Sequence, residues 1–195
     1  MFMFDSDLLL FFNSDRFPEL DSFFWYVSEK WVWIPVYSAM LFFLYKKYTG
    51  KKFLLIITCL IGLLTCSDQL ASGIFKKAVK RERPTYTEGL KEQLHLVQEP
   101  NGQLYRGGKY GFYSSHASNY MAVVVFFIML TRPLKRIAYL LLFTWVILIS
   151  FSRLYMGVHF PTDILMGWVM GGSLGLFFSF VFFKLSTTSY FLEIR

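Results

Sequence analysis

Charged residues are scarce in this sequence. Asp, Glu, Lys and Arg together make up 17% of the 195 residues, whereas hydrophobic residues make up 55% and Phe alone occurs 23 times. A water-soluble protein of this length needs more charge than this on its surface, so the composition excludes an ordinary soluble domain. Several long runs without charge instead predict helices that span a membrane.

Cysteine is also nearly absent. The two cysteines, Cys59 and Cys66, lie seven residues apart in one apolar run, which places them on one face of one helix. Side chains in that arrangement do not reach the geometry of a disulfide, so both are interpreted as small core residues. The cysteines therefore give no indication of the redox compartment of the protein.

Acidic residues are fewer than basic ones, and the formal net charge is +7. In a soluble domain this balance would suggest a nucleic-acid partner, but the sequence carries no nucleic-acid-recognition module. In a membrane protein, positive charge collects in cytoplasmic loops and beside anionic headgroups. We therefore expect the lipid bilayer as the partner, with no nucleic acid and no obligate protein partner evident.

Five apolar stretches bounded by charged residues predict an all-α, polytopic membrane helical bundle with five transmembrane helices. The second stretch has 23 residues, which at a rise of about 1.5 Å per residue is long enough to cross a bilayer. Between the second and third stretches lies the polar segment 77–113, which we expect to form an outer loop. The five stretches are residues 31–48, 53–75, 117–130, 137–150 and 164–183.

The N-terminal segment, residues 1–30, differs from the membrane domain that we expect over residues 31–195. Asn13 and Pro18 interrupt its apolar runs, so a regular sixth span is not expected. Two short amphipathic helices that lie in the membrane interface fit this pattern better. A sixth span over residues 5–28 stays open as an alternative.

The short loops predict the orientation of the bundle through the positive-inside rule. Basic residues gather in the loops on one side of the membrane, which is expected to be cytoplasmic. They are Lys46, Lys47, Lys51, Lys52, Arg132, Lys135, Arg136 and Lys184. The outer loop 77–113 then faces the exterior, and because this loop is itself basic we expect something anionic on that side.

Three polar clusters meet at the outer face, because successive spans reverse the direction of the chain. The first is "KKAVKRERP" at 76–84, the second is "YSSHASN" at 113–119, and the third is "SRLYMGVHFPTD" at 152–163. Each cluster lies at the end of an apolar stretch. Their convergence follows from the order of the spans and needs no motif.

Cations and helix starts in these clusters suit chemistry on a phosphate group. Lys76, Arg83 and Arg153 supply cationic donors, and the planar guanidinium of Arg can bind phosphate with two hydrogen bonds. Ser114 and Ser115 precede an apolar helix, where an N-cap and free backbone N–H groups attract an anion. We therefore expect these five residues to bind a substrate phosphate.

Two histidines lie in the same clusters. Either His116 or His159 can attack phosphorus while neutral, and the other can protonate the leaving oxygen. Asp163 follows His159 by four residues, a spacing that lets the carboxylate bond the imidazole and set its tautomer. A zinc site formed by these three residues is an alternative, but the clustered Lys and Arg would repel a cation, so we expect no metal.

Other polar and small residues have simpler interpretations. Gly167, Gly171 and Gly175 repeat every four residues, which is typical of close helix packing. His95 stands alone in the outer loop and predicts no chemistry. Asp68 lies within the second apolar stretch, where an acidic residue is either functional or a structural hydrogen-bonding group, and both interpretations stay open.

The three clusters resemble the motifs of the type 2 phosphatidic acid phosphatase superfamily, which includes membrane lipid phosphatases and soluble vanadium haloperoxidases. The family motif Lys, six residues, Arg-Pro is matched at 76–84. The motif Ser-Arg, five residues, His, three residues, Asp is matched in full at 152–163. The family motif Pro-Ser-Gly-His is matched in part at 113–116, where Tyr113 replaces Pro and Ser115 replaces Gly.

The resemblance implies a role for each motif residue. His159 resembles the nucleophile that forms a phosphohistidine, Asp163 resembles the acid that orients it, and His116 resembles the general acid for the leaving group. The residues that resemble the family's phosphate-binding set are Lys76, Arg83, Ser114, Ser115 and Arg153. Ser115 keeps the backbone N–H that a glycine offers, but its Cβ restricts the backbone.

The resemblance also implies a function. It points to an integral membrane lipid-phosphate phosphatase that hydrolyses a phosphomonoester or diphosphate lipid without a metal or other cofactor. The chain looks similar to bacterial undecaprenyl-diphosphate phosphatases, which implies the bacterial inner membrane and an active site that faces the periplasm or exterior. Two alternatives stay open: a lipid phosphotransferase that uses the same phosphohistidine, and a non-enzymatic phospholipid-binding membrane protein.

Overall fold

The computed structural model describes residues 2–13 and 18–192 of the chain. Within these residues the regular secondary structure is helical, and the only β-type pairings are two isolated bridges in the outer loop. The all-α fold predicted from the sequence is therefore confirmed. The predicted interfacial segment is described in part, because residues 1 and 14–17 lie outside the described residues.

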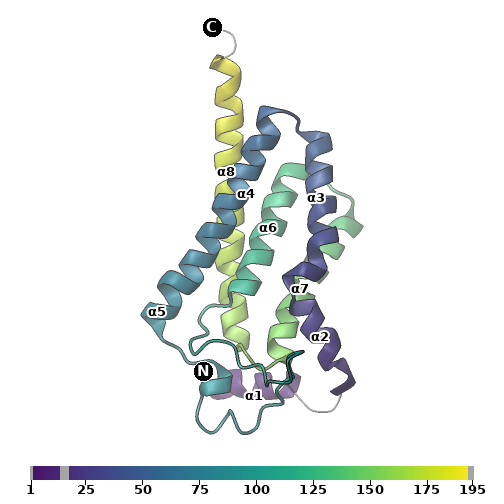
Figure 1. The fold of residues 1–195 in the computed structure, drawn as a ribbon. Helices are drawn as coiled ribbons and strands as arrows, with labels where there is room; N and C mark the ends of the chain where they lie inside the picture. Colours follow the sequence, from purple (N-terminus) through teal and green to yellow (C-terminus); the bar gives the residue numbers. More distant parts are fainter. Residues whose placement is uncertain (1, 14–17, 193–195) are drawn as a thin grey trace.

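The bundle consists of helices that coincide with the five apolar stretches. Figure 1 shows them running along a common axis, with the α3–α4 and α6–α7 turns at one end and the long α5–α6 connection at the other. The helices are α3 (Ile34–Lys47), α4 (Lys51–Asp68), α6 (Ser115–Thr131), α7 (Arg136–Tyr155) and α8 (Pro161–Leu192).

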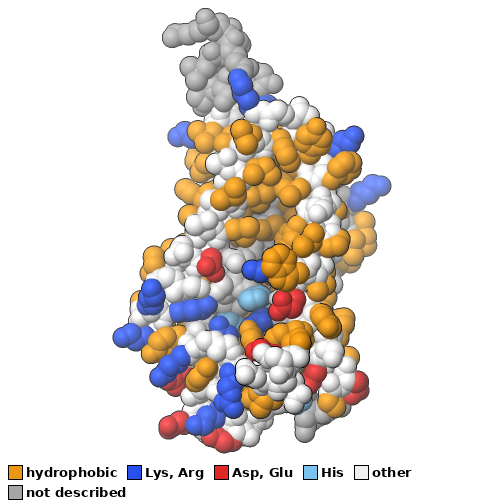
Figure 2. Space-filling model, viewed as in Figure 1, with side chains coloured by type: hydrophobic (Ala, Val, Ile, Leu, Met, Phe, Trp, Pro, Cys, Tyr) orange, Lys and Arg blue, Asp and Glu red, His pale blue; other side chains and the backbone are white. Residues whose placement is uncertain are grey.

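Among the described residues, three helical segments are long and apolar enough to cross a membrane, namely Lys51–Val79, Arg136–Tyr155 and Pro161–Thr187. The α6 helix is apolar but has 17 residues, and α3 has 14. The count of five spans therefore stays a prediction. Apolar side chains such as Leu54 and Leu140 are more than 60% exposed. Figure 2 shows hydrophobic side chains gathered over the upper part of the visible face of the bundle, which suits contact with lipid.

The α6 helix lies at the centre of the bundle because its side chains are apolar on nearly every face. Buried residues such as Val124 and Phe126 join side chains of α4, α7 and α8 in the main core. On α8, Gly167, Gly171 and Gly175 face α6, and a Cβ at any of them would lie less than 3.0 Å from an α6 atom. The predicted close packing of these glycines is confirmed.

The α4 helix does not stop at Asp68 but continues toward the end of the bundle that carries the loop 77–113, which is called the outer end after its predicted orientation. It passes into η3 (Gln69–Phe75), a π-helical segment, and then into α5 (Lys76–Val79). Lys80 ends the helix with a left-handed φ of 52°, as is common at helix C-termini. The helix therefore reaches three residues into the predicted outer loop 77–113, and the irregular part of that loop begins at Lys80.

The N-terminal segment and the outer loop cover the outer end of the bundle. In Figure 1, α1 (Phe2–Phe12) lies across the bundle axis, and α2 (Asp21–Ser28) packs against α7. The Asn13 amide donates to the carbonyl oxygens of His95 and Tyr155 at 2.8 and 2.6 Å. One side chain thus ties the N-terminal segment to the loop and to α7. Short 3-10 helices at Pro18–Leu20, Lys30–Trp33 and Pro84–Tyr86 complete the connections.

Candidate active site

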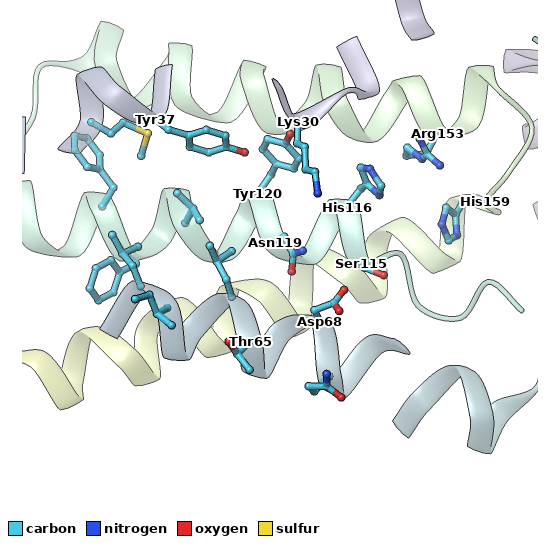
Figure 3. Close-up of a pocket in the computed structure, with 18 of the residues that line it drawn as sticks. Lys30, Tyr37, Thr65, Asp68, Ser115, His116, Asn119, Tyr120, Arg153 and His159 are labelled. Carbon is cyan, nitrogen blue, oxygen red and sulfur yellow. The ribbon is translucent and has the colours of Figure 1, made fainter. Parts of the chain in front are cut away.

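A cavity of about 1000 Å³ lies at the outer end of the bundle and extends between α3, α4 and α6 (Figure 3). Residues from all three sequence clusters line its polar end. They are Lys76, Arg83, Ser115, His116, Arg153 and His159. The fold therefore brings together six of the eight predicted site residues, while Ser114 and Asp163 lie behind the cavity wall.

The connection between α7 and α8 carries His159. The Val158 N–H donates to the Arg153 carbonyl at 3.1 Å and closes the end of α7. Gly157 then adopts a left-handed φ of 66°, which glycine tolerates without strain. This reversal brings His159 to the cavity wall, where the residue is 1% exposed.

Asp163 contacts His159 as the spacing predicted, although the two residues do not share a helix. Pro161 begins α8, a common first position for proline, so Asp163 lies in the first turn and His159 precedes it. The Asp163 Oδ2 atom lies 3.3 Å from His159 Nδ1 and accepts the Phe160 N–H at 3.1 Å. This contact engages Nδ1 and leaves Nε2 as the nitrogen available for chemistry.

His116 comes from the start of α6. Ser114 caps this helix, since its Oγ accepts the Ala117 N–H at 3.4 Å, and the Ser114 side chain is fully buried. Ser115 does line the cavity, and its Oγ accepts a hydrogen bond from Lys76 Nζ at 2.8 Å. His116 lines the cavity beside them (Figure 3) and has no hydrogen-bonding partner among the described residues.

The cations of the cavity wall lack acidic partners. Arg83 and Arg153 are 8% and 2% exposed. Arg153 Nη2 donates to the Tyr105 hydroxyl at 2.8 Å, whereas the bonds that Arg83 donates to described residues go to the backbone carbonyls of Tyr110 and Val158. Within residues 2–13 and 18–192, neither arginine nor Lys76 forms an ion pair with a carboxylate. Buried positive charge without a counter-ion is costly, so the cavity is suited to an anion.

Burial and these charges also set the protonation of His159. Burial, together with the neighbouring Arg83 and Arg153, lowers the pKa of His159 well below its usual range. The ring is therefore neutral at neutral pH, which is the state in which its nitrogen can attack. Burial and Arg153 also lower the pKa of Arg83 to about 10, which still leaves the guanidinium protonated at neutral pH.

Asp68 lies on the α4 side of the same cavity. The residue is exposed, and its carboxylate has no hydrogen-bonding partner among the described residues. Figure 3 shows it near Asn119 of α6. The functional and the structural interpretation of Asp68 both stay predictions.

The alternative zinc site is not formed. In the described part of the chain, no three His, Cys, Asp or Glu side chains form a group that could hold a metal ion. Of the three residues of that alternative, His116 and His159 line the cavity, whereas Asp163 lies behind its wall. Only the His159–Asp163 pair is in hydrogen-bonding contact.

Sequence reasoning missed two residues near the cavity. Lys30 lines it, and Arg81 donates to Asp163 Oδ1 at 2.8 Å. Lys30 comes from the 3-10 turn before α3, and no spacing rule connects that turn to the motifs. For Arg81, the one available signal was its position within the basic cluster 76–84.

Comparison with known proteins places these features in a family. The model of the PAP2 superfamily matches residues 54–186. A lipid A 4'-phosphatase from Porphyromonas gingivalis is 37% identical over 179 residues, which cover 89% of this chain and 70% of that protein. A lipid A 4'-phosphatase from Bacteroides thetaiotaomicron is 34% identical and covers 93% of this chain and 78% of its own length.

Two solved structures share the fold. The crystal structure of Aquifex aeolicus LpxE superposes with a TM-score of 0.60 at 23% identity, covering 88% of this chain and 92% of the other. A PAP2-type phosphatidylglycerolphosphate phosphatase from Bacillus subtilis gives a TM-score of 0.64 at 18% identity, covering 92% and 83%. At these identities the structural similarity supports the shared fold and nothing further.

Proposed function

Because the chain belongs to the PAP2 superfamily and is a membrane lipid phosphatase, we propose that it hydrolyses a phosphorylated membrane lipid through a covalent phosphohistidine at His159. The observation that carries this proposal is the combination of an oriented, neutral histidine with buried cations that have no acidic partner in the described part of the chain. An anion held by those cations would lie beside the free Nε2 atom of His159.

In the first step, Nε2 of His159 attacks phosphorus. A nitrogen–phosphorus bond forms as the bond between phosphorus and the lipid oxygen breaks, and His116 gives its proton to that oxygen. Burial and Arg153 lower the pKa of His116, so the negative charge of the bound phosphate is what holds this ring protonated for the step. Lys76, Arg83 and Arg153 balance the charge on the phosphoryl oxygens, so their side chains do the work of electrostatic stabilisation. Asp163 holds Nδ1–H and stabilises the positive ring that results.

In the second step, water replaces the histidine. His116, now neutral, takes a proton from water while the water oxygen bonds to phosphorus and the nitrogen–phosphorus bond breaks. Inorganic phosphate leaves, and both histidines return to their starting protonation states. The Ser115 backbone N–H lies at the start of α6, where it can donate to a phosphoryl oxygen. The Ser114 side chain caps the helix, so we assign it to shaping this site rather than to direct contact.

The inner part of the cavity supports a lipid substrate. Apolar side chains of α3, α4 and α6 line it directly beyond the polar end and form an apolar groove. A lipid whose phosphate lies among the cations would place its acyl chains in this groove. The lining residues there include Met40, Leu41, Leu44, Ile57, Leu60, Ile61, Leu64, Val123, Phe126 and Phe127. We infer that the lipid enters sideways from the outer leaflet of the bacterial inner membrane, with the α1–α2 segment in its interface.

Relatives guide the choice of lipid. The proteins that are 37% and 34% identical are lipid A 4'-phosphatases, and a phosphatidylglycerophosphatase B from Bacillus subtilis is 28% identical over 71% of this chain. We therefore propose a lipid A phosphate as the first substrate to test. Phosphatidylglycerol phosphate, undecaprenyl diphosphate and phosphatidic acid complete the panel.

The test is phosphate release from this panel by the purified protein in detergent, with acid quenching to trap a labelled phosphoenzyme. We expect release without added metal and a label that is stable in base and labile in acid, as a phosphoramidate is. A wild-type rate for His159→Ala would refute the mechanism. Transfer of the label to an added acceptor lipid instead of water would identify a phosphotransferase.

A further inference from the structure

Arg81 connects the nucleophile segment to α1. Its Nη1 atom donates to Asp163 Oδ1 at 2.8 Å and to Thr162 Oγ1 at 2.6 Å, and its Nη2 atom pairs with Asp5 Oδ2 at 2.5 Å. The second Asp5 oxygen accepts the Thr162 N–H at 3.1 Å. A series of ionic hydrogen bonds thus runs from α1 to the carboxylate that bonds His159.

This series is shielded from water. Asp5 is 3% exposed and Asp163 is fully buried. Leu9 of α1 forms a buried apolar cluster with Leu90 and Phe160, and the Arg81 guanidinium lies 4.1 Å from the centre of the Phe160 ring. Ionic hydrogen bonds in such surroundings are stronger than on a protein surface.

The balance of charge explains the role of the Asp5 carboxylate. Arg81 alone would neutralise Asp163 and weaken its effect on His159. Asp5 adds a further negative charge, so the group of Asp5, Arg81 and Asp163 stays net negative. When Nε2 of His159 bonds to phosphorus the ring becomes positive, and a net negative neighbour stabilises that charge.

Asp5 also acts on the start of α8. The Thr162 N–H belongs to the first turn of that helix, where backbone N–H groups lack partners within the helix. By accepting this N–H, the Asp5 carboxylate caps the helix that carries Asp163. The contact therefore holds the Asp163 backbone as well as its carboxylate.

We propose that Asp5 and Arg81 are positioning residues for phosphoryl transfer, which hold Asp163 against His159 and keep their group net negative. This inference rests on the proposed nucleophilic role of His159. It makes α1 a part of the active site and gives the N-terminal segment a purpose beyond contact with the membrane.

The test is Asp5→Asn in the full-length protein, which removes the charge and keeps the shape. We expect kcat to fall about 10- to 100-fold, with KM and the binding of inorganic phosphate unchanged, because the cations that hold phosphate are not altered. Asp7→Asn is the matched control. Asp7 lies on the same helix, is exposed and has no ionic partner among the described residues, so wild-type kcat is expected.

A double-mutant cycle separates positioning from folding. Asp5→Asn should cost little in an Asp163→Asn background, because both changes act through one contact, and should cost its full amount in an Arg83→Gln background. If Asp5→Asn does not fold, Arg81→Lys carries the same expectation, since Lys keeps the charge but loses the two-pronged geometry.

The outcomes distinguish this inference from the mechanism on which it rests. A wild-type kcat for Asp5→Asn, or full additivity with Asp163→Asn, would overturn the inference while His159→Ala remains inactive. Activity that survives His159→Ala would instead remove the proposed function itself.

Discussion

The two histidines of the cavity have contrasting surroundings. His159 is 1% exposed, and its Nδ1 atom is held by Asp163, which is itself held by the Phe160 N–H and by Arg81. His116 is half-buried at the start of α6 and has no hydrogen-bonding partner among the described residues. One ring is held rigidly, and the other faces open space.

This contrast matches two different tasks. A nucleophile attacks from one direction in every turnover, so hydrogen bonds that hold its ring save the cost of orienting it. A group that gives a proton to a lipid oxygen and later takes one from water needs room for both partners. The empty space around His116 is therefore where the leaving oxygen and the water would lie. Four experiments test the roles of these histidines and of the cavity around them.

The largest effect is expected for His159→Ala. Phosphate release should fall by at least about 10⁴-fold for every substrate, because no nitrogen–phosphorus bond can form. The measurement is phosphate release together with acid-quenched labelling of the protein. His95→Ala is the control, since His95 lies outside the cavity and its loss should leave the labelling intact. A labelled phosphoenzyme in His159→Ala would contradict the assignment.

His116→Ala should show an effect that depends on the leaving group. For a lipid phosphate, the rate should fall about 10²- to 10⁴-fold, the usual range for a lost general acid. With p-nitrophenyl phosphate, nitrophenolate leaves without a proton, so the first step should survive while hydrolysis of the phosphoenzyme stays slow. Stopped-flow absorbance should show a burst of nitrophenolate. Equal losses on both substrates would mean that His116 is not the acid.

Arg153→Gln should change the pH dependence of kcat/KM. In the wild type, burial and the cations Arg83 and Arg153 lower the pKa of His159, so the ring stays neutral and reactive in mildly acidic solution. Without Arg153 the protonated ring is less disfavoured, the pKa of His159 rises, and activity is lost at a higher pH as the pH falls. We expect the acid limb to move up by roughly 0.5 to 1 unit.

The ionisation of the substrate affects Arg153→Gln and the wild type equally. The ratio of their kcat/KM values at each pH therefore reports the protonation of His159. Arg106→Gln removes the same charge from an exposed position outside the cavity, and its acid limb should stay in place. If the acid limb moves equally in Arg153→Gln and Arg106→Gln, the net charge of the protein and not the neighbouring Arg153 sets the pKa of His159.

The smallest effect is expected for Ile61→Trp, which partly fills the apolar groove. KM for a long-chain lipid phosphate should rise about 5- to 10-fold because acyl chains lose apolar contact area, while p-nitrophenyl phosphate should react normally. Leu140→Trp on α7 is matched in exposure, at 62% against 63% for Ile61, but it lies outside the cavity. Similar changes for both variants would argue against lipid binding in this groove.

Much of this architecture could be predicted from local features. The positions of the helices follow from apolar runs between charges, and the cap of α6 by Ser114 follows from a serine before an apolar helix. The meeting of the clusters 76–84, 113–119 and 152–163 follows from chain reversal. These predictions succeeded because each depends on a short stretch of sequence or on the order of the spans.

Other features could not be predicted in this way. The π-helical segment that carries α4 on to Lys76 changes the helical register without a sequence signal, and the outer loop was expected to start three residues earlier. The position of Asp68 on the cavity wall could not be predicted from its place within an apolar stretch. The direction of a side chain depends on the packing of its neighbours, which no single spacing records.

Residue type and hydrophobic pattern are local properties, so they predict which chemical groups are present: histidines, cations and a carboxylate at the ends of apolar helices. Which of these groups touch depends on how the helices fold together. Asp5 and Thr162 are 157 residues apart and meet in one hydrogen bond, and the groove exists only between α3, α4 and α6. Contacts between residues so far apart in the sequence depend on how whole helices pack. Burial of apolar surface drives this packing, and because it is non-directional it favours one arrangement of the whole chain and not single pairs of residues.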